Sequence, residues 1–121
     1  MERTDAVIAL AALAQDSRLD TYRLLVAAGP EGMPAGEVAA ALGLPPNTLS
    51  FHFDRLRQAG LVTVRRAGRS MIYAARFDTM NALLGFLTDN CCGGKPEKCL
   101  PSGAPGKRKP QGGKRREKAD A

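Results

Sequence analysis

Residues 41–76 read ALGLPPNTLSFHFDRLRQAGLVTVRRAGRSMIYAAR. A short helix that begins after Pro34 is expected to stop at Gly43, since glycine favours helix C-termini. A second helix is predicted over residues 46–59, with Pro46 suited to the first turn. Two helices joined by a tight turn of three or four residues that contains glycine are typical of a helix-turn-helix unit.

Two short candidate strands follow the second helix of this unit. Residues 61–66 (LVTVRR) and 71–76 (MIYAAR) predict strands, and the glycine-containing segment 67–70 between them predicts a hairpin turn. A two-stranded hairpin directly after the second helix of such a unit is a wing. The stretch therefore predicts a winged helix-turn-helix.

Helices are also expected on both sides of this stretch. Apolar residues recur at helical spacing over residues 4–15, 16–28 and 77–90. In the second of these helices, capped by Asp16 or Ser17, we expect Leu19, Tyr22 and Val26 to face inward. The sequence thus predicts a mainly α fold of order α–α–α–α–β–β–α, with a winged-helix domain over residues 1–92.

The first and last predicted helices each have a stripe of apolar residues that is expected to be buried against another surface. The first stripe packs either on its own domain or against a second copy of the chain, and the last helix is the other natural dimer surface. We expect a homodimer formed through Val7, Leu10, Ala11, Met80, Leu83, Leu84 and Leu87.

Charge is unevenly distributed along the 121 residues. Residues 1–94 contain nine arginines and nine acids, whereas residues 95–121 contain nine Lys and Arg against three acids. Residues 55–76 hold six arginines and no acid. A basic patch on a neutral body is typical of a protein that binds nucleic acid. Residues 100–121 are predicted to be a disordered basic tail, which either adds DNA affinity or only aids solubility.

One face of the helix over 46–59 has side chains suited to double-stranded DNA. Amide, guanidinium and hydroxyl groups read base edges in the major groove or hold phosphates, and arginines at the wing reach the minor groove or the backbone. For His52, a helix-to-helix hydrogen bond is the alternative, and Asp54 is expected to orient Arg55 or Arg57. The predicted DNA contacts are Asn47, Thr48, Ser50, Phe51, His52, Arg55, Arg65, Arg66 and Arg69.

The three cysteines of the chain fall within nine residues, at Cys91, Cys92 and Cys99. The segment 91–99 is a candidate thiol sensor beside the predicted DNA reader. An odd number of cysteines argues against a secreted disulfide framework, and no stretch is long enough to span a membrane. Acidic residues in the N-terminal segment do not suit a signal peptide. We expect a cytoplasmic protein that is not an enzyme.

The quoted stretch resembles the ArsR/SmtB family of bacterial repressors. The features that carry the resemblance are Thr48-x-Ser50-x-His52, the segment Ala59–Val62 and the arginine-rich wing, together with ALAQDSRLDTYRLLV at residues 12–26. The resemblance covers roughly residues 6–90 and implies a symmetric dimer that represses an operon until an ion binds. The Cys-x-Cys pair that many members carry before the recognition helix is absent here, as is the His/Asp zinc site of the last helix.

The cysteines instead resemble those of an arsenite-responsive subgroup, which has a Cys-Cys pair and a third cysteine after the last helix. The resemblance implies that Cys91, Cys92 and Cys99 bind As(III), or Sb(III), as the effector, with no organic cofactor. Thiolates select soft ions, whereas structural zinc asks for four ligands. The alternatives left open are a thiol-redox switch, a zinc- or cadmium-responsive repressor of the same fold, and a DNA-binding protein with no effector.

Overall fold

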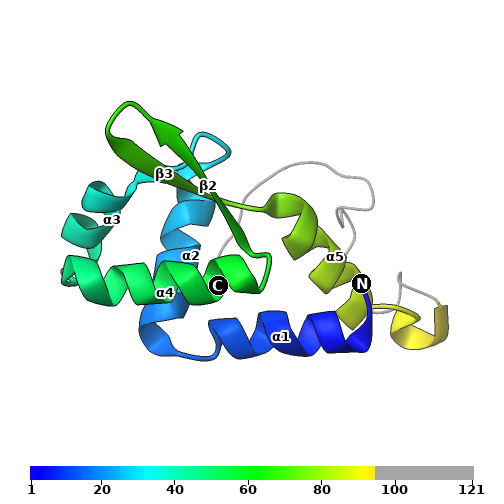
Figure 1. The fold of residues 1–121 in the computed structure, drawn as a ribbon. Coiled ribbons are helices and arrows are strands. Elements are labelled where there is room, and N and C mark those ends of the chain that lie inside the picture. The colour runs from blue at the N-terminus through cyan, green and yellow to red at the C-terminus, as the bar shows by residue number, and fades with distance from the viewer. Residues whose placement is uncertain (95–121) are drawn as a thin grey trace. The chain divides into compact units, whose positions relative to one another are not determined.

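The computed structural model describes residues 1–94 of the chain (Figure 1). The chain divides into two compact units, Met1–Leu87 and Thr88–Ala121. The second unit is described only as far as Gly94. The predictions that concern Cys99 and the tail at 100–121 lie outside the described residues.

The order of elements confirms the predicted winged helix-turn-helix and adds one short strand. The first unit contains α1 (Arg3–Leu13), α2 (Asp16–Ala28), β1 (Met33–Pro34), α3 (Ala35–Leu42), α4 (Pro46–Gln58), β2 (Val62–Ala67), β3 (Ser70–Ala75) and α5 (Phe77–Leu87).

The strand that the sequence did not predict, β1, completes a three-stranded antiparallel sheet of order β1-β3-β2. Met33 pairs with Tyr73 in β3. Gly32 makes this pairing possible, because its φ of 76° is unfavourable for other residues and a Cβ there would overlap the carbonyl oxygen of Tyr73. The hairpin of β2 and β3, hereafter the wing, extends from the end of α4 (Figure 1).

The helix ends follow the local sequence. Gly43 takes a left-handed conformation (φ 66°) after α3, and Pro46 opens α4. At α2 the expected cap is wrong: neither Asp16 nor Ser17 caps the helix. Gln15 does so, because its side-chain oxygen accepts a hydrogen bond of 2.8 Å from the backbone N–H of Arg18.

A single apolar core joins the helices to the sheet. Its fully buried members include Leu25 of α2, Val38 of α3 and Leu56 of α4. The inward face predicted for α2 is partly wrong, since Leu19 and Val26 are exposed while Thr21 is buried. Thr21 tolerates burial because its hydroxyl donates a 2.7 Å hydrogen bond to the carbonyl of Ser17.

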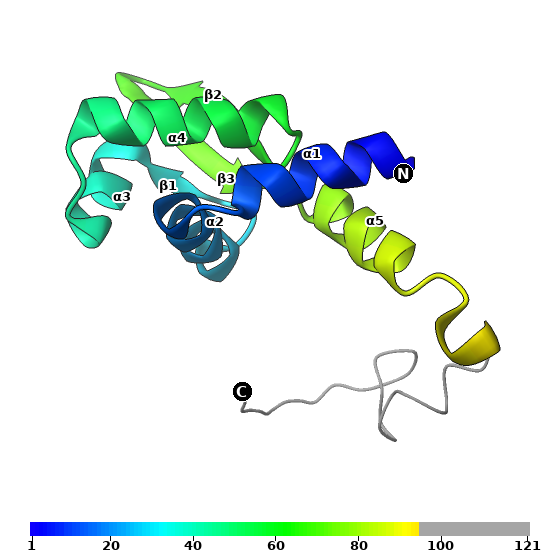
Figure 2. The same ribbon diagram turned by 90° about the horizontal axis from the view of Figure 1, so that it is seen from below.

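The outer helices α1 and α5 divide their apolar residues between the core and the surface. Leu83 is 3% exposed and Met80 packs against the core, so the expectation that Leu83 lies at a dimer surface is wrong: its own chain covers it. Figure 2 shows α5 beginning beside α1. Ala11 is exposed as well, and the large apolar side chains that remain exposed on these two helices are Val7, Ile8, Leu10, Leu84, Phe86 and Leu87. Among the described residues, no helix has the length and apolar character to cross a membrane.

Candidate nucleic-acid interface and thiol segment

The helix α4 has one buried and one exposed face, as the sequence predicted. Leu49, Phe53 and Leu56 are buried and attach the helix to the core. The opposite face is polar and open to solvent, and it carries Asn47, Thr48, Ser50, Phe51, Asp54, Arg55 and Gln58. The structure therefore presents most of the predicted contacts on one surface, and their contact with DNA stays a prediction.

Two arginines on this helix have different environments. The guanidinium of Arg55 lies 4.9 Å from the ring centroid of Phe51, within the range of a cation–π contact. Arg57 forms an ion pair of 2.8 Å with Asp54, one of the two arrangements expected for that carboxylate. Asp54 is thus neutralised locally, and Arg55 keeps its charge for a ligand.

The first turn of α4 is organised by its own side chain. The Oδ1 atom of Asn47 accepts a 3.0 Å hydrogen bond from the backbone N–H of Thr48. This bond holds Asn47 at the positive end of the helix, where backbone N–H groups favour anions such as phosphate.

His52 is not on the exposed flank where the sequence placed it. Its side chain is only 6% exposed, and its Nδ1 atom has no hydrogen-bond partner among the described residues. Burial lowers the pKa of His52, and the positive charge of Arg18 lowers it further. The ring is therefore neutral at pH 7 and belongs to the interior beneath α4, so a direct base contact by His52 is not supported.

The wing presents its arginines unequally. Ala67 pairs with Ser70, which leaves Gly68 and Arg69 as the turn. All three wing arginines are exposed, but among residues 1–94 only Arg65 forms a side-chain hydrogen bond, of 3.3 Å from Nη1 to the carbonyl oxygen of Glu31. The structure therefore separates two open arginines from one that is tied to the loop before β1.

The second unit contains two of the three residues predicted as thiol ligands, of which Cys91 is disulfide-bonded in the structure and Cys92 is free. Cys91 begins a short 3₁₀ turn that ends at Gly94, and the Sγ atoms of Cys91 and Cys92 lie 3.6 Å apart. Cys92 is an exposed free cysteine. Its φ is positive, at 54°, and so is that of Asn90, at 58°. The chain turns sharply at this point and brings the two sulfurs side by side.

Arg18 is a residue that the sequence did not single out. It donates a 2.7 Å hydrogen bond from Nε to the carbonyl oxygen of Ala12, and this bond connects the end of α1 to α2. The sequence predicts that Arg18 lies near the start of α2. It gives no sign that Arg18 lies close enough to His52 to lower the pKa of the histidine.

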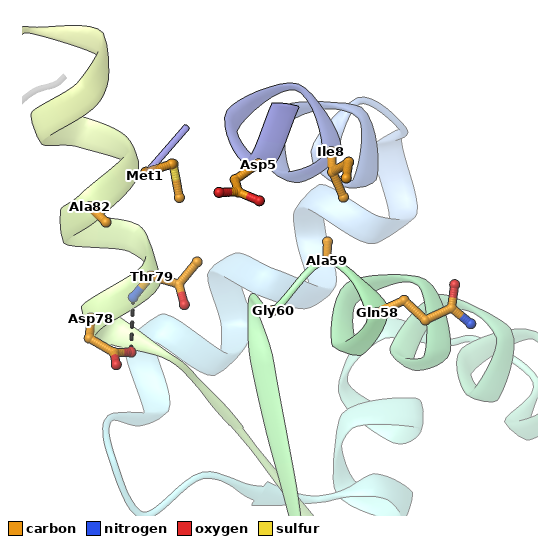
Figure 3. Close-up of a pocket in the computed structure, with 9 residues that line it drawn as sticks. All are labelled: Met1, Asp5, Ile8, Gln58, Ala59, Gly60, Asp78, Thr79 and Ala82. Carbon is orange, nitrogen blue, oxygen red and sulfur yellow. Dashed lines mark hydrogen bonds between the residues drawn. The ribbon is translucent and has the colours of Figure 1, made fainter. Parts of the chain in front are cut away.

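Two clefts lie against α1 on either side of Ile8. The first, of ≈ 390 Å³, is bounded by α1, the end of α4 and the start of α5, and it contains Asp5 and Asp78. In Figure 3, Ile8 on α1 and Ala59 after α4 face each other across this region. The second, of ≈ 470 Å³, lies between α1 and the exposed face of α4 and contains Arg18 and Arg55. Asp78 accepts hydrogen bonds from Arg76 and from the N–H of Thr79, which lower its pKa.

The chain is similar to known regulators over the same region. Residues 13–65 match the family of the helix-turn-helix domain. Over 77 residues the chain is 39% identical to the HTH-type transcriptional regulator YceK of Bacillus subtilis, covering 63% of this chain and 76% of that one. It is 36% identical to the nodulation protein NolR of Rhizobium meliloti, covering 70% of each.

A solved structure shows the same architecture. The homodimeric winged helix-turn-helix DNA-binding domain of a possible ArsR-family regulator from Mycobacterium bovis has a TM-score of 0.59 and 29% identity, covering 72% of this chain and 81% of that one. Together with the exposed face of α4 and the wing, these similarities show that the chain belongs to the DNA-binding helix-turn-helix transcriptional regulators and has the winged-helix fold of their ArsR-like members.

Proposed function

We propose that this regulator is a homodimeric repressor that leaves its operator when As(III), or Sb(III), binds to Cys91, Cys92 and Cys99. The observation that carries the proposal is the pair of sulfur atoms of Cys91 and Cys92, 3.6 Å apart at a sharp turn shortly after α5 in the sequence. Cys91 is disulfide-bonded in the structure, so ion binding requires its reduction to the thiolate. The third thiol, Cys99, follows within a further seven residues.

The sulfur separation fits a shared soft ion. A bond from a metal to sulfur is about 2.3 Å long, so two ligands on one centre cannot lie more than about 4.6 Å apart. The observed 3.6 Å falls within that limit. Three thiolates match an ion that forms a three-sulfur pyramid, whereas a closed zinc site asks for a fourth ligand. Among residues 1–94, no cluster of three or more His, Cys, Asp or Glu side chains offers a rival metal site.

The dimer is proposed from the apolar residues that the monomer leaves exposed. Val7 and Leu10 on α1, and Leu84 and Leu87 on α5, are all more than two-fifths exposed. Exposed apolar side chains of this kind, on two helices that contact each other, are typical of a protein interface. A two-fold dimer then presents two copies of α4, one for each half of a palindromic operator.

The release follows from linkage between the two sites. Ion capture ties the segment from Cys91 to Cys99 into a closed loop at the end of the proposed dimer helix, and the two reading helices lose the spacing that DNA requires. If the ion weakens DNA binding by a given factor, DNA weakens ion binding by the same factor. The coupling expected for such a pair of sites is about 1–3 kcal/mol.

The test is an operator-release assay with each cysteine replaced in turn. Fluorescence anisotropy of labelled operator DNA is measured under reducing conditions while arsenite, antimonite or zinc is added. We expect arsenite to release the native protein, and each of Cys91→Ser, Cys92→Ser and Cys99→Ser to abolish release without altering DNA affinity. Thr88→Ser, in the same unit but before the cysteine segment, serves as the control and keeps the response. If arsenite still releases the triple Cys→Ser variant from DNA, the cysteines are not the sensor. If the native protein does not bind operator DNA at all, the proposal that it is a repressor is wrong.

A further inference from the structure

The second cleft beside Ile8 combines two predicted DNA contacts, Phe51 and Arg55, with Arg18 and Ile8, which neither DNA reading nor thiol sensing uses. It occupies ≈ 470 Å³, within the size range of small-molecule sites of about 300–1,000 Å³. Its walls come from α1, the start of α2 and the stripe of α4 that repeats every helical turn. The lining residues are Ile8, Ala11, Ala12, Arg18, Phe51, Arg55, Gln58 and Ala59.

The charged residues that line this cleft are all positive. Arg18 and Arg55 both line it, no acidic residue does, and neither guanidinium has an ion-pair partner among residues 1–94. Arg18 uses its Nε atom to bind the carbonyl of Ala12 at 2.7 Å. Arg55 rests on the ring of Phe51. Each guanidinium is thus held by a neutral group and keeps further N–H donors for an anion.

Apart from Gln58, the remaining side chains that line the cleft are apolar. Ile8, Ala11 and Ala59 provide aliphatic walls, and the ring of Phe51 provides an aromatic one. The first cleft, on the other side of Ile8, contains Asp5 and Asp78 instead, and Asp78 is paired with Arg76. The two arginines therefore favour an anion in the second cleft.

We propose that the cleft between α1 and α4, lined by Arg18, Arg55, Phe51 and Ile8, is a binding site for a small aromatic carboxylate. The carboxylate accepts hydrogen bonds from the two guanidinium groups, and the ring packs between Ile8 and Phe51. Carboxylates bound by arginine form strong, charge-assisted hydrogen bonds, and apolar walls with a few placed polar groups are the usual form of a ligand site.

The site has a direct route to DNA binding, and this part of the inference rests on the proposed function. Phe51 and Arg55 lie on the exposed face of α4 and also line the cleft. A carboxylate held by Arg55 competes with DNA for the same guanidinium. The bound anion is thus expected to weaken operator binding by a path that does not involve the cysteines.

His52 provides a specific reporter of occupancy. It is the only histidine in the chain, so its ring gives a single set of proton signals in NMR spectra. Its ring lies 6.1 Å from that of Phe51, and the positive charge of Arg18 contributes to its lowered pKa. An anion bound at Arg18 offsets that charge, so the pKa of His52 should rise when the site is filled.

The experiment uses the full chain and benzoate as the probe, at constant ionic strength. We expect benzoate to bind with one site per chain, to shift the backbone amide signals of Ile8 and Ala59, and to raise the pKa of His52. Benzyl alcohol, which has the ring without the charge, should bind at least about tenfold more weakly. Acetate, which has the charge without the ring, should also bind more weakly. Equal binding of benzoate and benzyl alcohol would overturn the proposal.

Matched variants place the anion in this cleft. Arg18→Gln is expected to weaken benzoate binding about tenfold, since it removes one charge-assisted contact. Arg23→Gln removes an equal charge from an exposed position on the same helix outside the cleft and should leave benzoate binding unchanged. Ile8→Glu, at an exposed position, should abolish binding by placing a carboxylate in the cleft. Undiminished binding in Ile8→Glu and Arg18→Gln would refute the site.

DNA-binding measurements distinguish the effect of this site from that of the thiol sensor. Benzoate should weaken operator binding in the triple Cys→Ser variant as much as in the native chain, whereas arsenite should act only on the native chain. Benzoate that binds in the cleft and leaves operator affinity unchanged would overturn the proposed link to DNA, with the arsenite response unaffected.

Discussion

The ring of Tyr73 in the wing lies parallel to the ring of Phe53 in α4, with centroids 3.7 Å apart and planes inclined by 6°. Phe53 is buried on the inner face of the helix whose outer face carries Arg55. The stack therefore fixes the wing and the recognition helix relative to each other, and these are the two elements predicted to touch DNA.

The stack should be measurable as a coupling energy. Phe53→Leu and Tyr73→Leu each lower the free energy of unfolding, and the double variant should lose about 0.5–1.5 kcal/mol less than the sum of the two. Urea denaturation of the four proteins measures the difference. Strict additivity would show that the two rings do not stabilise each other.

Gly32 should be intolerant of a side chain. Gly32→Ala is expected to cost more than about 1 kcal/mol, because a Cβ would overlap the carbonyl oxygen of Tyr73 and the φ of 76° is unfavourable for alanine. Gly36 in α3 has nothing within 4 Å of an added Cβ, so Gly36→Ala should stabilise by about 0.5–1 kcal/mol. Thermal or urea denaturation compares the two. Equal effects would contradict the account of β1.

Stability should fall as the buried His52 becomes protonated. The pKa of His52 is lowered in the folded chain, so folding favours the neutral ring. This contribution is fully present above the ordinary value of 6.5 and is lost as the pH falls below it towards the lowered pKa. Urea denaturation from pH 7.5 to 5 should show the loss, and His52→Leu should flatten that part of the profile. A profile unaltered by the substitution would exclude His52 as the cause.

The wing arginines should differ in their contribution to the salt dependence of DNA binding. Arg69→Gln removes an exposed guanidinium at the turn and should reduce the slope of log affinity against log salt by about 1. Arg65→Gln removes a guanidinium that is bound to the carbonyl of Glu31, and a smaller change is expected. Titrations of operator DNA at several salt concentrations test the difference. A larger effect at Arg65 would contradict the assignment.

The proposed dimer surface should be sensitive to charge. Leu87 on α5 is 54% exposed, and Leu87→Glu should shift the protein towards monomers, because an isolated carboxylate is costly to bury. Val26 on α2 is exposed outside the proposed surface, so Val26→Glu should leave the dimer intact. Sedimentation velocity distinguishes the two species. A native chain that sediments as a monomer, or a dimer that only Val26→Glu dissociates, would contradict the surface.

Sequence patterns predicted the elements whose determinants are local. Gly43, Pro46 and the glycine in the wing turn act on their immediate neighbours, so α3, α4 and the hairpin were found nearly to the residue. The strand β1 was missed because two residues have no periodicity and the pairing depends on the distant Tyr73. Its one sequence signal was Gly32, which also reads as an ordinary helix end.

The interior faces were harder to predict, since an apolar side chain serves equally well in a core or at an interface. Leu83 and Leu84 are adjacent and chemically identical, yet the first is buried in its own chain and the second is 51% exposed. The prediction for His52 was wrong because histidine is a polar residue and was therefore expected to be exposed. Its neutral ring is buried in the interior instead. Only packing geometry separates such cases.

The wing turn has a consequence for the length of DNA that this chain can cover. Only Gly68 and Arg69 lie between the paired residues Ala67 and Ser70, so the reach of the hairpin is set by the number of rungs in its ladder. One extra residue in each strand would move the tip outward by about 3.3 Å, close to the rise of one base pair. If the wing contacts DNA as predicted, each pair of inserted residues is expected to lengthen the protected footprint by about one base pair.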